Sequence, residues 1–394
     1  MEYNSRMSMK EKMTARMMSL VAALLAFPAL ASIEILEPAE GALVPLHTDV
    51  QKAYIALPAA ERRARFADAK FRRHLSRGGE RLPGEKKPRE SFWPRTVRLA
   101  WKGDVGVAYK VEVRDVRKGT VVADGTAEGS GELRIDNLEI AAKYEWTVSG
   151  GGETAKGTFS TEDVAPRLVR FPGVPNVRDL GGHIGLGGRR VRQGLVFRSA
   201  GLNSNSTKGE NGRQPGTSRV EGANGEYIRA RFGIKSDIDL RTGRECYGMS
   251  GSPLGPTVKL FNYPSSSYGK MTNETARAAF AKVFRVFLDE KNYPIDFHCI
   301  AGQDRTGSVA YIPNGLLGVD ENQLALDWEA TGFRNGNANF CHEKRYDKLV
   351  EVFEKAYPGL PLRDRLEKYV LSLGFTMADI EKFRRIMLEG YAGN

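Results

Sequence analysis

Hydrophobic and polar residues alternate in short runs through the first part of the chain. Residues 97–101, 108–113 and 144–148 each place apolar side chains at every second position, and glycine-containing turns separate these runs. A period of two is typical of strands that bury one face. Several such strands predict a small β-sandwich domain over residues 32–163.

Residues 48–95 lack this alternation and interrupt the predicted sandwich. Four apolar residues recur there at helical spacing: Ala64, Ala67, Phe71 and Leu75. The spacing predicts a helix with one apolar stripe. Residues 61–95 hold twelve Lys and Arg against five Asp and Glu. Two interpretations stay open, a contact with an anionic surface or a solvated helical insertion with basic faces.

After residue 163 the pattern changes to short apolar runs that alternate with amphipathic stretches. Residues 236–240 and 293–297 predict buried strands, and residues 275–288 predict a helix. Strands that alternate with helices are typical of an α/β domain, which we expect over residues 164–394. Pro313 falls inside another predicted helix and should kink it or end it early.

The first 31 residues have the order of a targeting segment. Basic residues come first, a short apolar run covers residues 20–27, and residues 29–31 read Ala-Leu-Ala. This order is typical of a secretory signal peptide, and the apolar run is too short to span a membrane. We therefore expect residues 1–31 to be a signal peptide and the protein to be exported, either periplasmic or secreted.

Composition narrows the class of protein further. The chain is 41% hydrophobic and 27% charged, which is ordinary for a globular protein and excludes a collagen-like or largely disordered one. The formal net charge is +11. An exported chain without a nucleic-acid-binding motif is not expected to bind nucleic acid despite that charge. No cluster of His, Asp and Glu has the spacing of a metal site, so no metal or other cofactor is expected.

One stretch, residues 298–307, concentrates the candidate chemistry. It reads His-Cys-Ile-Ala-Gly-Gln-Asp-Arg-Thr-Gly, between a predicted strand and a predicted helix. The amides of a strand–loop–helix turn favour an anion, and the same field stabilises a thiolate at Cys299. The planar guanidinium of Arg305 can bind two oxygens of a phosphoryl group.

This stretch resembles the phosphate-binding loop of the cysteine-dependent protein tyrosine phosphatases, His-Cys-x-x-Gly-x-x-Arg-Thr-Gly. Three further motifs narrow the resemblance to the bacterial tyrosine/serine protein phosphatases. They are Asn-Val-Arg-Asp-Leu-Gly-Gly at residues 176–182, Phe-Arg-Ser-Ala at 197–200 and Asp-Leu-Arg-Thr at 239–242. The resemblance runs from about residue 171 to the C-terminus. It implies a protein tyrosine phosphatase-like α/β domain that hydrolyses phosphomonoesters.

The resemblance also implies a role for each residue of the motifs. Cys299 is the nucleophile, Arg305 stabilises charge on the phosphoryl oxygens, and Asp304 protonates the leaving oxygen. Asp239 is the alternative acid, because other tyrosine phosphatases take the acid from a separate loop. The substrate-binding residues are Ile300, Ala301, Gly302, Gln303 and Thr306. The supporting residues are His298, Asn176, Arg178, Asp179, Asp239 and Arg241.

Gln303 departs from the family pattern, which usually has Lys at this position. That Lys adds a positive charge suited to phosphoinositides, and Gln303 lacks this charge. We therefore expect a phosphotyrosine substrate, with phosphoserine or phosphothreonine as a further option. A phosphoinositide or inositol phosphate is the alternative substrate. A third interpretation is an envelope-binding module that carries a weak or inactive phosphatase domain.

Two further features of the sequence stay open. The strand-rich domain resembles fibronectin type III domains, because Leu138 and Tyr144 are spaced as in a tyrosine corner. Cys246 and Cys341 could pair in an exported protein or remain free thiols, since nothing in their spacing demands a disulfide.

Overall fold

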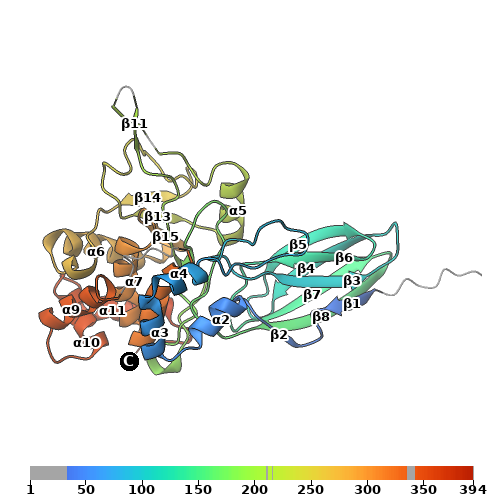
Figure 1. Cartoon of the computed structure of the whole chain (residues 1–394), viewed down its shortest axis with the longest axis horizontal. Helices are drawn as coiled ribbons and strands as arrows, with labels where there is room; N and C mark the ends of the chain where they lie inside the picture. The colour runs from blue at the N-terminus through green and yellow to red at the C-terminus, as the bar shows by residue number, and fades with distance from the viewer. Residues whose placement is uncertain (1–32, 210–211, 215, 335–341, 394) are drawn as a thin grey trace, which may run out of the picture. The chain divides into compact units, whose positions relative to one another are not determined.

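The computed structural model describes residues 33–209, 212–214, 216–334 and 342–393 (Figure 1). The chain forms two compact units. The described part of the first unit comprises residues 33–42, 98–134 and 144–159, and the second comprises the remaining described residues. The predicted signal peptide, residues 1–31, lies outside the described residues.

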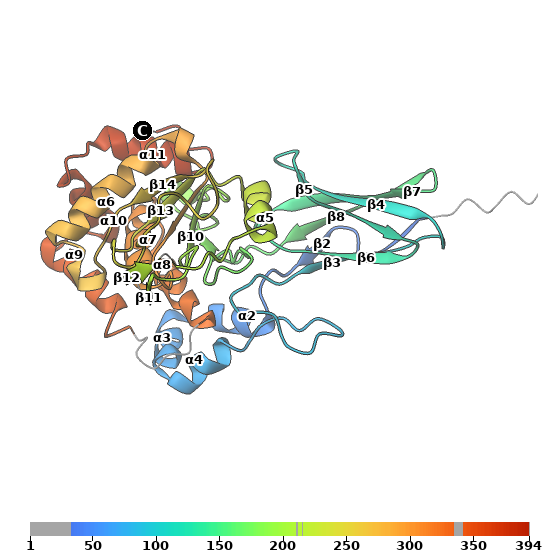
Figure 2. The same ribbon diagram turned by 90° about the horizontal axis from the view of Figure 1, so that it is seen from above.

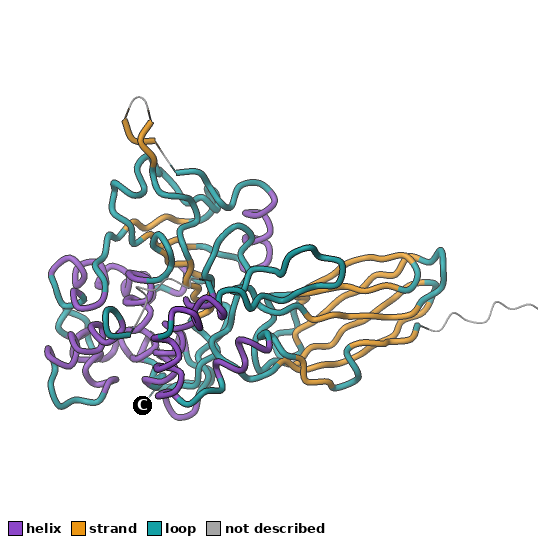
Figure 3. The backbone as a smooth tube through the Cα atoms, in the orientation of Figure 1, coloured by secondary structure: helices purple, strands orange, loops and turns teal. Residues whose placement is uncertain are grey.

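The first unit is built from strands (Figure 3). Its strands belong to a three-stranded sheet of order β1-β3-β6 and a five-stranded sheet of order β2-β8-β7-β4-β5. The bounds are β1 Glu34–Glu37, β2 Ala42–Val44, β3 Val97–Lys102, β4 Ala108–Asp115, β5 Val121–Glu128, β6 Gly131–Ile135, β7 Lys143–Gly150 and β8 Glu153–Thr161. The residues that alternate in the sequence bury their apolar side chains, since Tyr109, Val111 and Trp146 are at most 1% exposed. The strands predicted from the period of two are therefore present.

Residues 48–95 form three short helices within the second unit: α2 Asp49–Ile55, α3 Ala59–Ala67 and α4 Ala69–Leu75. The expected apolar stripe was wrong, because Ala64 and Ala67 are exposed. Asp68 ends α3 and caps α4, so the helical phase is reset between the two halves of the predicted stripe. The buried residues of α3 are instead Arg62 and Phe66.

The second unit contains a five-stranded sheet of order β14-β13-β15-β10-β9. The β14–β13, β13–β15 and β15–β10 pairs are parallel, and β9 is antiparallel to β10. The strands are β9 Arg178–Asp179, β10 Val196–Ser199, β13 Ser236–Asp239, β14 Lys259–Asn262 and β15 Ile295–His298. A separate hairpin joins β11 Thr207–Gly209 to β12 Gly212–Gln214. The sheet bears out the predicted α/β class.

Helices cover both faces of this sheet. They are α5 Ala223–Phe232, α6 Glu274–Phe287, α7 Asp304–Leu316, α8 Glu321–Glu329, α9 Tyr346–Ala356, α10 Leu362–Leu371 and α11 Met377–Met387. Short 3₁₀ turns are η1 Leu186–Gly188, η2 Tyr268–Lys270, η3 Glu290–Asn292 and η4 Ala330–Phe333. The helix α5 lies across the sheet from α6, α7 and α11 (Figure 2).

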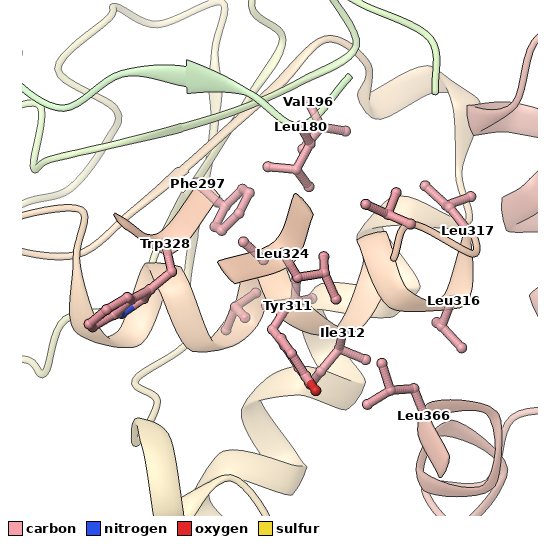
Figure 4. Close-up of a cluster of buried hydrophobic side chains, with 14 of the residues drawn as sticks. Leu180, Val196, Phe297, Tyr311, Ile312, Leu316, Leu317, Leu324, Trp328 and Leu366 are labelled. Carbon is pink, nitrogen blue, oxygen red and sulfur yellow. The ribbon is translucent and has the colours of Figure 1, made fainter. Parts of the chain in front are cut away.

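Successive side chains of the central strands point to opposite faces of the sheet and pack in two different hydrophobic cores. Val196 and Phe297 belong to the larger core with α7, α8 and α10 (Figure 4), whereas Phe197 packs with Phe232 of α5. Helix α7 passes through Pro313 and continues to Leu316, so the expectation of an early end was wrong. Residues 306–316 are all buried, and this packing holds the last turn in place despite the missing donor.

Candidate active site

The phosphate-loop residues 299–303 connect the carboxyl end of β15 to the first turn of α7. Gly302 adopts a φ of +65°, and a Cβ there would lie 2.5 Å from backbone atoms of Ser199. Only glycine fits a turn that combines positive φ with such a close approach. The loop is thereby held against the end of β10, at the edge where open α/β sheets carry their sites.

Cys299 is 2% exposed. Burial alone would raise the pKa of its thiol. Hydrogen bonds from the Thr306 hydroxyl and amide, the charge of Arg305 and the Ala301 amide outweigh burial, and the pKa of Cys299 is lowered. The Thr306 hydroxyl is buried and has no other hydrogen-bond partner among the described residues. The loop therefore favours a thiolate, the nucleophilic form of cysteine.

Arg305 forms a two-point ion pair with Glu245. Its Nη1 and Nη2 donate to Oε2 and Oε1 of Glu245 at 2.7 Å and 2.9 Å. Burial would raise the pKa of Glu245, but the hydrogen bonds from Arg305 and Thr242 lower it to about 2. The pair fixes the plane of the guanidinium.

Asp304 begins α7, and its side chain is 36% exposed. The Tyr268 hydroxyl donates to its Oδ1 at 2.6 Å, and Arg345 pairs with the same oxygen. Asp304 and Arg305 both line an open pocket of about 910 Å³. The other lining residues are Thr242, Arg244, Glu245, Ser265, Ser266, Ser267, Tyr268, Lys270, Lys344 and Arg345.

Asp239 occupies a different environment from Asp304. It is 1% exposed and accepts hydrogen bonds from the Nε and Nη2 of Arg241 at 2.9 Å and 2.7 Å. Burial would raise the pKa of Asp239, but the charges of His298 and Arg241 lower it. Asp239 is therefore held as a buried carboxylate, and it does not line the pocket.

His298 lies in a buried layer of carboxylates between the sheet and α5. Its Nε2 lies 2.9 Å from Asp237 Oδ1, and its Nδ1 lies 3.3 Å from the carbonyl oxygen of Cys299. Burial would lower the pKa of His298, but the carboxylates of Asp239, Asp237 and Asp296 raise it to about 9. The imidazolium therefore supports the strand that ends at the nucleophile.

Asn176 and Arg178 hold the phosphate loop by its backbone. Asn176 Nδ2 donates to the carbonyls of Ala301 and Gly302 at 3.0 Å and 3.1 Å. Arg178 donates to Asn176 Oδ1 and to Asp327 Oδ1. Thus the turn-rich motif of residues 176–182 orients the carbonyls outward and leaves the loop amides for an anion.

Asp179 and Gln303 are both buried beside this network. Asp179 accepts hydrogen bonds from Arg167 and from the amides of Gly181 and Gly194 at 2.6–2.8 Å, so it orders its own turn. The side chain of Gln303 is 5% exposed at the start of α7.

Residues 169–389, more than half of the chain, match the family model described as the tyrosine phosphatase family. The chain belongs to the tyrosine phosphatase family. This confirms the family predicted from the four sequence motifs. A protein of Cupriavidus necator, provisionally named a tyrosine-protein phosphatase, is 30% identical over 189 residues. That match spans 43% of this chain and 65% of the relative's length.

Two solved structures show weaker likenesses to this tyrosine phosphatase family member. The core catalytic domain of the PP-IP phosphatase SIW14 from S. cerevisiae is 15% identical over 45% of this chain and 94% of that one, with a TM-score of 0.23. A Bifidobacterium dentium β-glucuronidase is 14% identical over 52% of this chain and 34% of that one, with a TM-score of 0.15. At these TM-scores neither likeness supports a conclusion about fold or function.

Several residues around the candidate site were given no role from the sequence. They are Arg198, Glu245, Tyr268, Asp327, Arg334 and Arg345. Arg198 lies in the last half of β10, and Glu245 follows the carboxyl end of β13, a signal that could have drawn attention to both. Asp327 lies within α8, where nothing in the sequence distinguishes it from a solvated helix residue.

Two kinds of site are absent from the described part of the chain. Among those residues, no group of three or more His, Cys, Asp and Glu side chains is placed to hold a metal ion. Likewise, none of the described helices combines the length and apolar character that a membrane span requires. Cys246 forms no disulfide with a described residue, and Cys341 lies outside the described residues.

Proposed function

We propose that the protein is a cysteine-dependent phosphatase that hydrolyses phosphotyrosine, and other phosphomonoesters of similar shape, through a thiophosphate intermediate. The observation that carries this proposal is the lowered pKa of Cys299 in a loop whose next cation is Arg305. The amides of the turn favour negative charge, so they stabilise the Cys299 thiolate and also bind the phosphoryl group that this nucleophile attacks.

The first chemical step forms a bond between the Cys299 sulfur and phosphorus while the bond from phosphorus to the leaving oxygen breaks. Asp304 supplies the proton that this oxygen takes up, since its carboxyl group lines the pocket whereas Asp239 is buried. Loop amides and Arg305 stabilise the charge on the three remaining phosphoryl oxygens.

The second step releases inorganic phosphate. Asp304, now ionised, accepts a proton from water as the water oxygen bonds to phosphorus and the sulfur–phosphorus bond breaks. The Thr306 hydroxyl donates to the departing sulfur and stabilises the thiolate that is restored. The loop residues Ile300, Ala301 and Gly302 contribute backbone amides to the phosphate throughout.

A second candidate substrate class is a phosphoinositide or inositol phosphate. The pocket is lined by five cationic residues, namely Arg244, Lys270, Arg305, Lys344 and Arg345, against the carboxylates of Glu245 and Asp304. This excess of positive charge favours substrates that carry more than one anionic group. Four of these five cations, all except Arg305, lie outside the stretch 298–307, so the excess does not depend on a charge at position 303.

Three further parts of the proposal concern the regions outside the catalytic residues. The segment 1–31 directs export, so the enzyme acts in the periplasm or outside the cell. The strands of residues 32–163 form a fibronectin type III-like sandwich. The exposed basic residues within 61–95 contact an anionic surface of the envelope. Recovery of the mature chain outside the cytoplasm, beginning near residue 32, tests the first of these.

The test of the chemistry is Cys299→Ser. Hydrolysis of p-nitrophenyl phosphate should be abolished, while tungstate, a phosphate analogue, should still bind because the loop and Arg305 remain. The matched control is Cys246→Ser, a second thiol that lies outside the phosphate loop and should leave turnover unchanged. Turnover near the wild-type rate in Cys299→Ser would refute the mechanism. Wild-type protein that binds tungstate without turnover would favour the envelope-binding alternative.

A further inference from the structure

A short segment behind the phosphate loop, residues 327–334, holds that loop at several points. We call it the anchor segment. Arg334 Nη1 donates to the carbonyl of Ala301 at 3.3 Å. Asp327 pairs with Arg198, whose Nη2 donates to the carbonyl of Gly302 at 2.9 Å. The position of the anchor segment therefore helps to set the position of two consecutive loop carbonyls.

The anchor segment also restrains Arg178, which orients Asn176 against the same carbonyls. Asp327 Oδ1 accepts from Arg178 Nε at 2.9 Å, and Thr331 Oγ1 accepts from its Nη2 at 3.3 Å. Asp327 is 6% exposed and Thr331 is fully buried. Burial would raise the pKa of Asp327, but the charges of Arg198 and Arg178 lower it to about 2. A carboxylate held between two buried guanidinium groups is rigid and strongly oriented.

The helical insertion, residues 48–95, packs directly on the anchor segment. Glu329 is 1% exposed, and the Tyr54 hydroxyl donates to its Oε2 at 2.8 Å. Arg62 pairs with the same oxygen, and His342 Nε2 lies 2.7 Å from Oε1. A buried carboxylate of this kind depends on its partners to remain in place.

Apolar contacts and a backbone hydrogen bond reinforce the same junction. The ring of Phe66 lies 5.7 Å from that of Trp328, and a Cβ on Gly332 would lie 2.7 Å from the Phe66 ring. The Ser91 hydroxyl donates to the carbonyl of Phe333, the residue before Arg334. Three separate points of the insertion thus hold the anchor segment immediately before its contact with the phosphate loop.

We propose that the insertion is a positioning element for the phosphate loop and that Arg62 is its main positioning residue. Arg62 holds Glu329, and Glu329 fixes the anchor segment. Arg334 and Asp327 of that segment then hold the loop carbonyls, Asp327 through Arg198. The insertion lies outside the family match, which begins at residue 169. It therefore adds support to the phosphate loop from outside the matched region.

The inference rests on the proposed phosphatase function, but thiol ionisation and tungstate binding test it without turnover. The test uses the full chain with Cys246→Ser and Cys341→Ser, which leaves Cys299 as the sole cysteine. The pH dependence of its alkylation by iodoacetate gives the thiol pKa. In Arg62→Ala this pKa should rise, because a displaced Ala301 amide no longer stabilises the thiolate. Tungstate should bind about tenfold more weakly, as for the loss of roughly one hydrogen bond.

Two further variants separate positioning from general stabilisation. Arg65→Ala is the matched control, because Arg65 lies on the same helix and pairs with the exposed Glu61 at 3.0 Å. It should leave both readouts unchanged. Arg62→Lys keeps the charge beside Glu329 but loses the planar fork, and it should give intermediate values.

The outcomes are distinguishable. A folded Arg62→Ala protein with a lower Tm, but with wild-type thiol pKa and tungstate affinity, would overturn the proposal and leave the insertion as a stabilising element. If Arg62→Ala does not fold, Ser91→Ala and Arg62→Lys carry the test, and wild-type values in both would refute it. Wild-type protein without turnover would contradict the proposed function, while the comparison of thiol pKa values among the variants would still decide the role of the insertion.

Discussion

Glu245 and Arg305 form an end-on pair in which each carboxylate oxygen faces one terminal nitrogen of the guanidinium, at 2.7 Å and 2.9 Å. An end-on pair leaves the Nε edge of the arginine for another anion. Glu245 and a phosphoryl group can therefore contact the same arginine at once. We interpret Glu245 as the residue that turns Arg305 toward the phosphate loop.

Glu245→Ala should lower kcat/KM by roughly 10- to 100-fold, because Arg305 loses its fixed plane and the phosphoryl oxygens lose a well-oriented partner. Glu245→Gln keeps one acceptor and should lose less. Steady-state kinetics with tungstate inhibition would measure both effects. Since the pKa of Glu245 is lowered to about 2, the carboxylate stays ionised in the fold down to about that pH. The contribution of the pair to folding stability is full above pH 4.5 and is lost as the pH falls from 4.5 through 2. Tighter tungstate binding in Glu245→Ala would show instead that the carboxylate competes with phosphate.

Asp304→Asn should lower kcat by about 100- to 10,000-fold on phosphotyrosine, the range expected for loss of a general acid. The loss should be smaller on p-nitrophenyl phosphate, whose leaving group needs less protonation. Asp239→Asn is the comparison, because it breaks a buried pair with Arg241 and should reduce stability and both activities alike. If instead Asp239→Asn lost more activity on phosphotyrosine than on p-nitrophenyl phosphate, and Asp304→Asn lost both equally, Asp239 would be the general acid.

Asp296→Asn should change how stability depends on pH. Burial and the nearby Asp237 carboxylate raise the pKa of Asp296 to about 7, above the value of about 3.9 for an unfolded aspartate. A raised pKa stabilises the fold fully below the unfolded value, and this contribution is lost as the pH rises through 7. The Tm of the wild type minus that of the variant should therefore decrease from pH 4 to pH 7. A difference that stays constant over this range would show that Asp296 is ionised in the fold at pH 4.

Lys270→Ala should reduce activity on a polyphosphorylated inositol headgroup more than activity on a phosphotyrosine peptide. One exposed cation contributes about 1 kcal/mol to each close pair, or several-fold in affinity, and salt should screen the effect. The two specificity constants at low and high ionic strength measure this. Lys291→Ala, an exposed lysine that does not line the pocket, is the control. An equal change on both substrates would place Lys270 away from any second phosphate.

The buried polar layer shows a limit of pattern analysis. On β15 the residues Ile295, Asp296, Phe297 and His298 alternate apolar and polar, which usually indicates one solvated face. All four are fully buried. Hydrogen bonds and ion pairs between Asp296, Ser199, Asp237 and His298 make this burial tolerable. Alternation therefore revealed the strand, while the environment of its second face depended on residues from two other strands.

The sequence by itself determined the α/β class, the strands of the first unit and the phosphate loop, because these depend on local periodicity and on residues that are adjacent in the chain. It also predicted the family, because Cys299 and Arg305 belong to one short loop, and their spacing can therefore be recognised in the sequence alone. Only the tertiary structure placed Glu245 against Arg305, separated Asp304 from Asp239 by burial, and brought Arg62 to Glu329 across 267 positions. Ion pairs and burial depend on distances in space, and no periodic pattern along the chain records which charged residues the packing of the helices and strands will bring together.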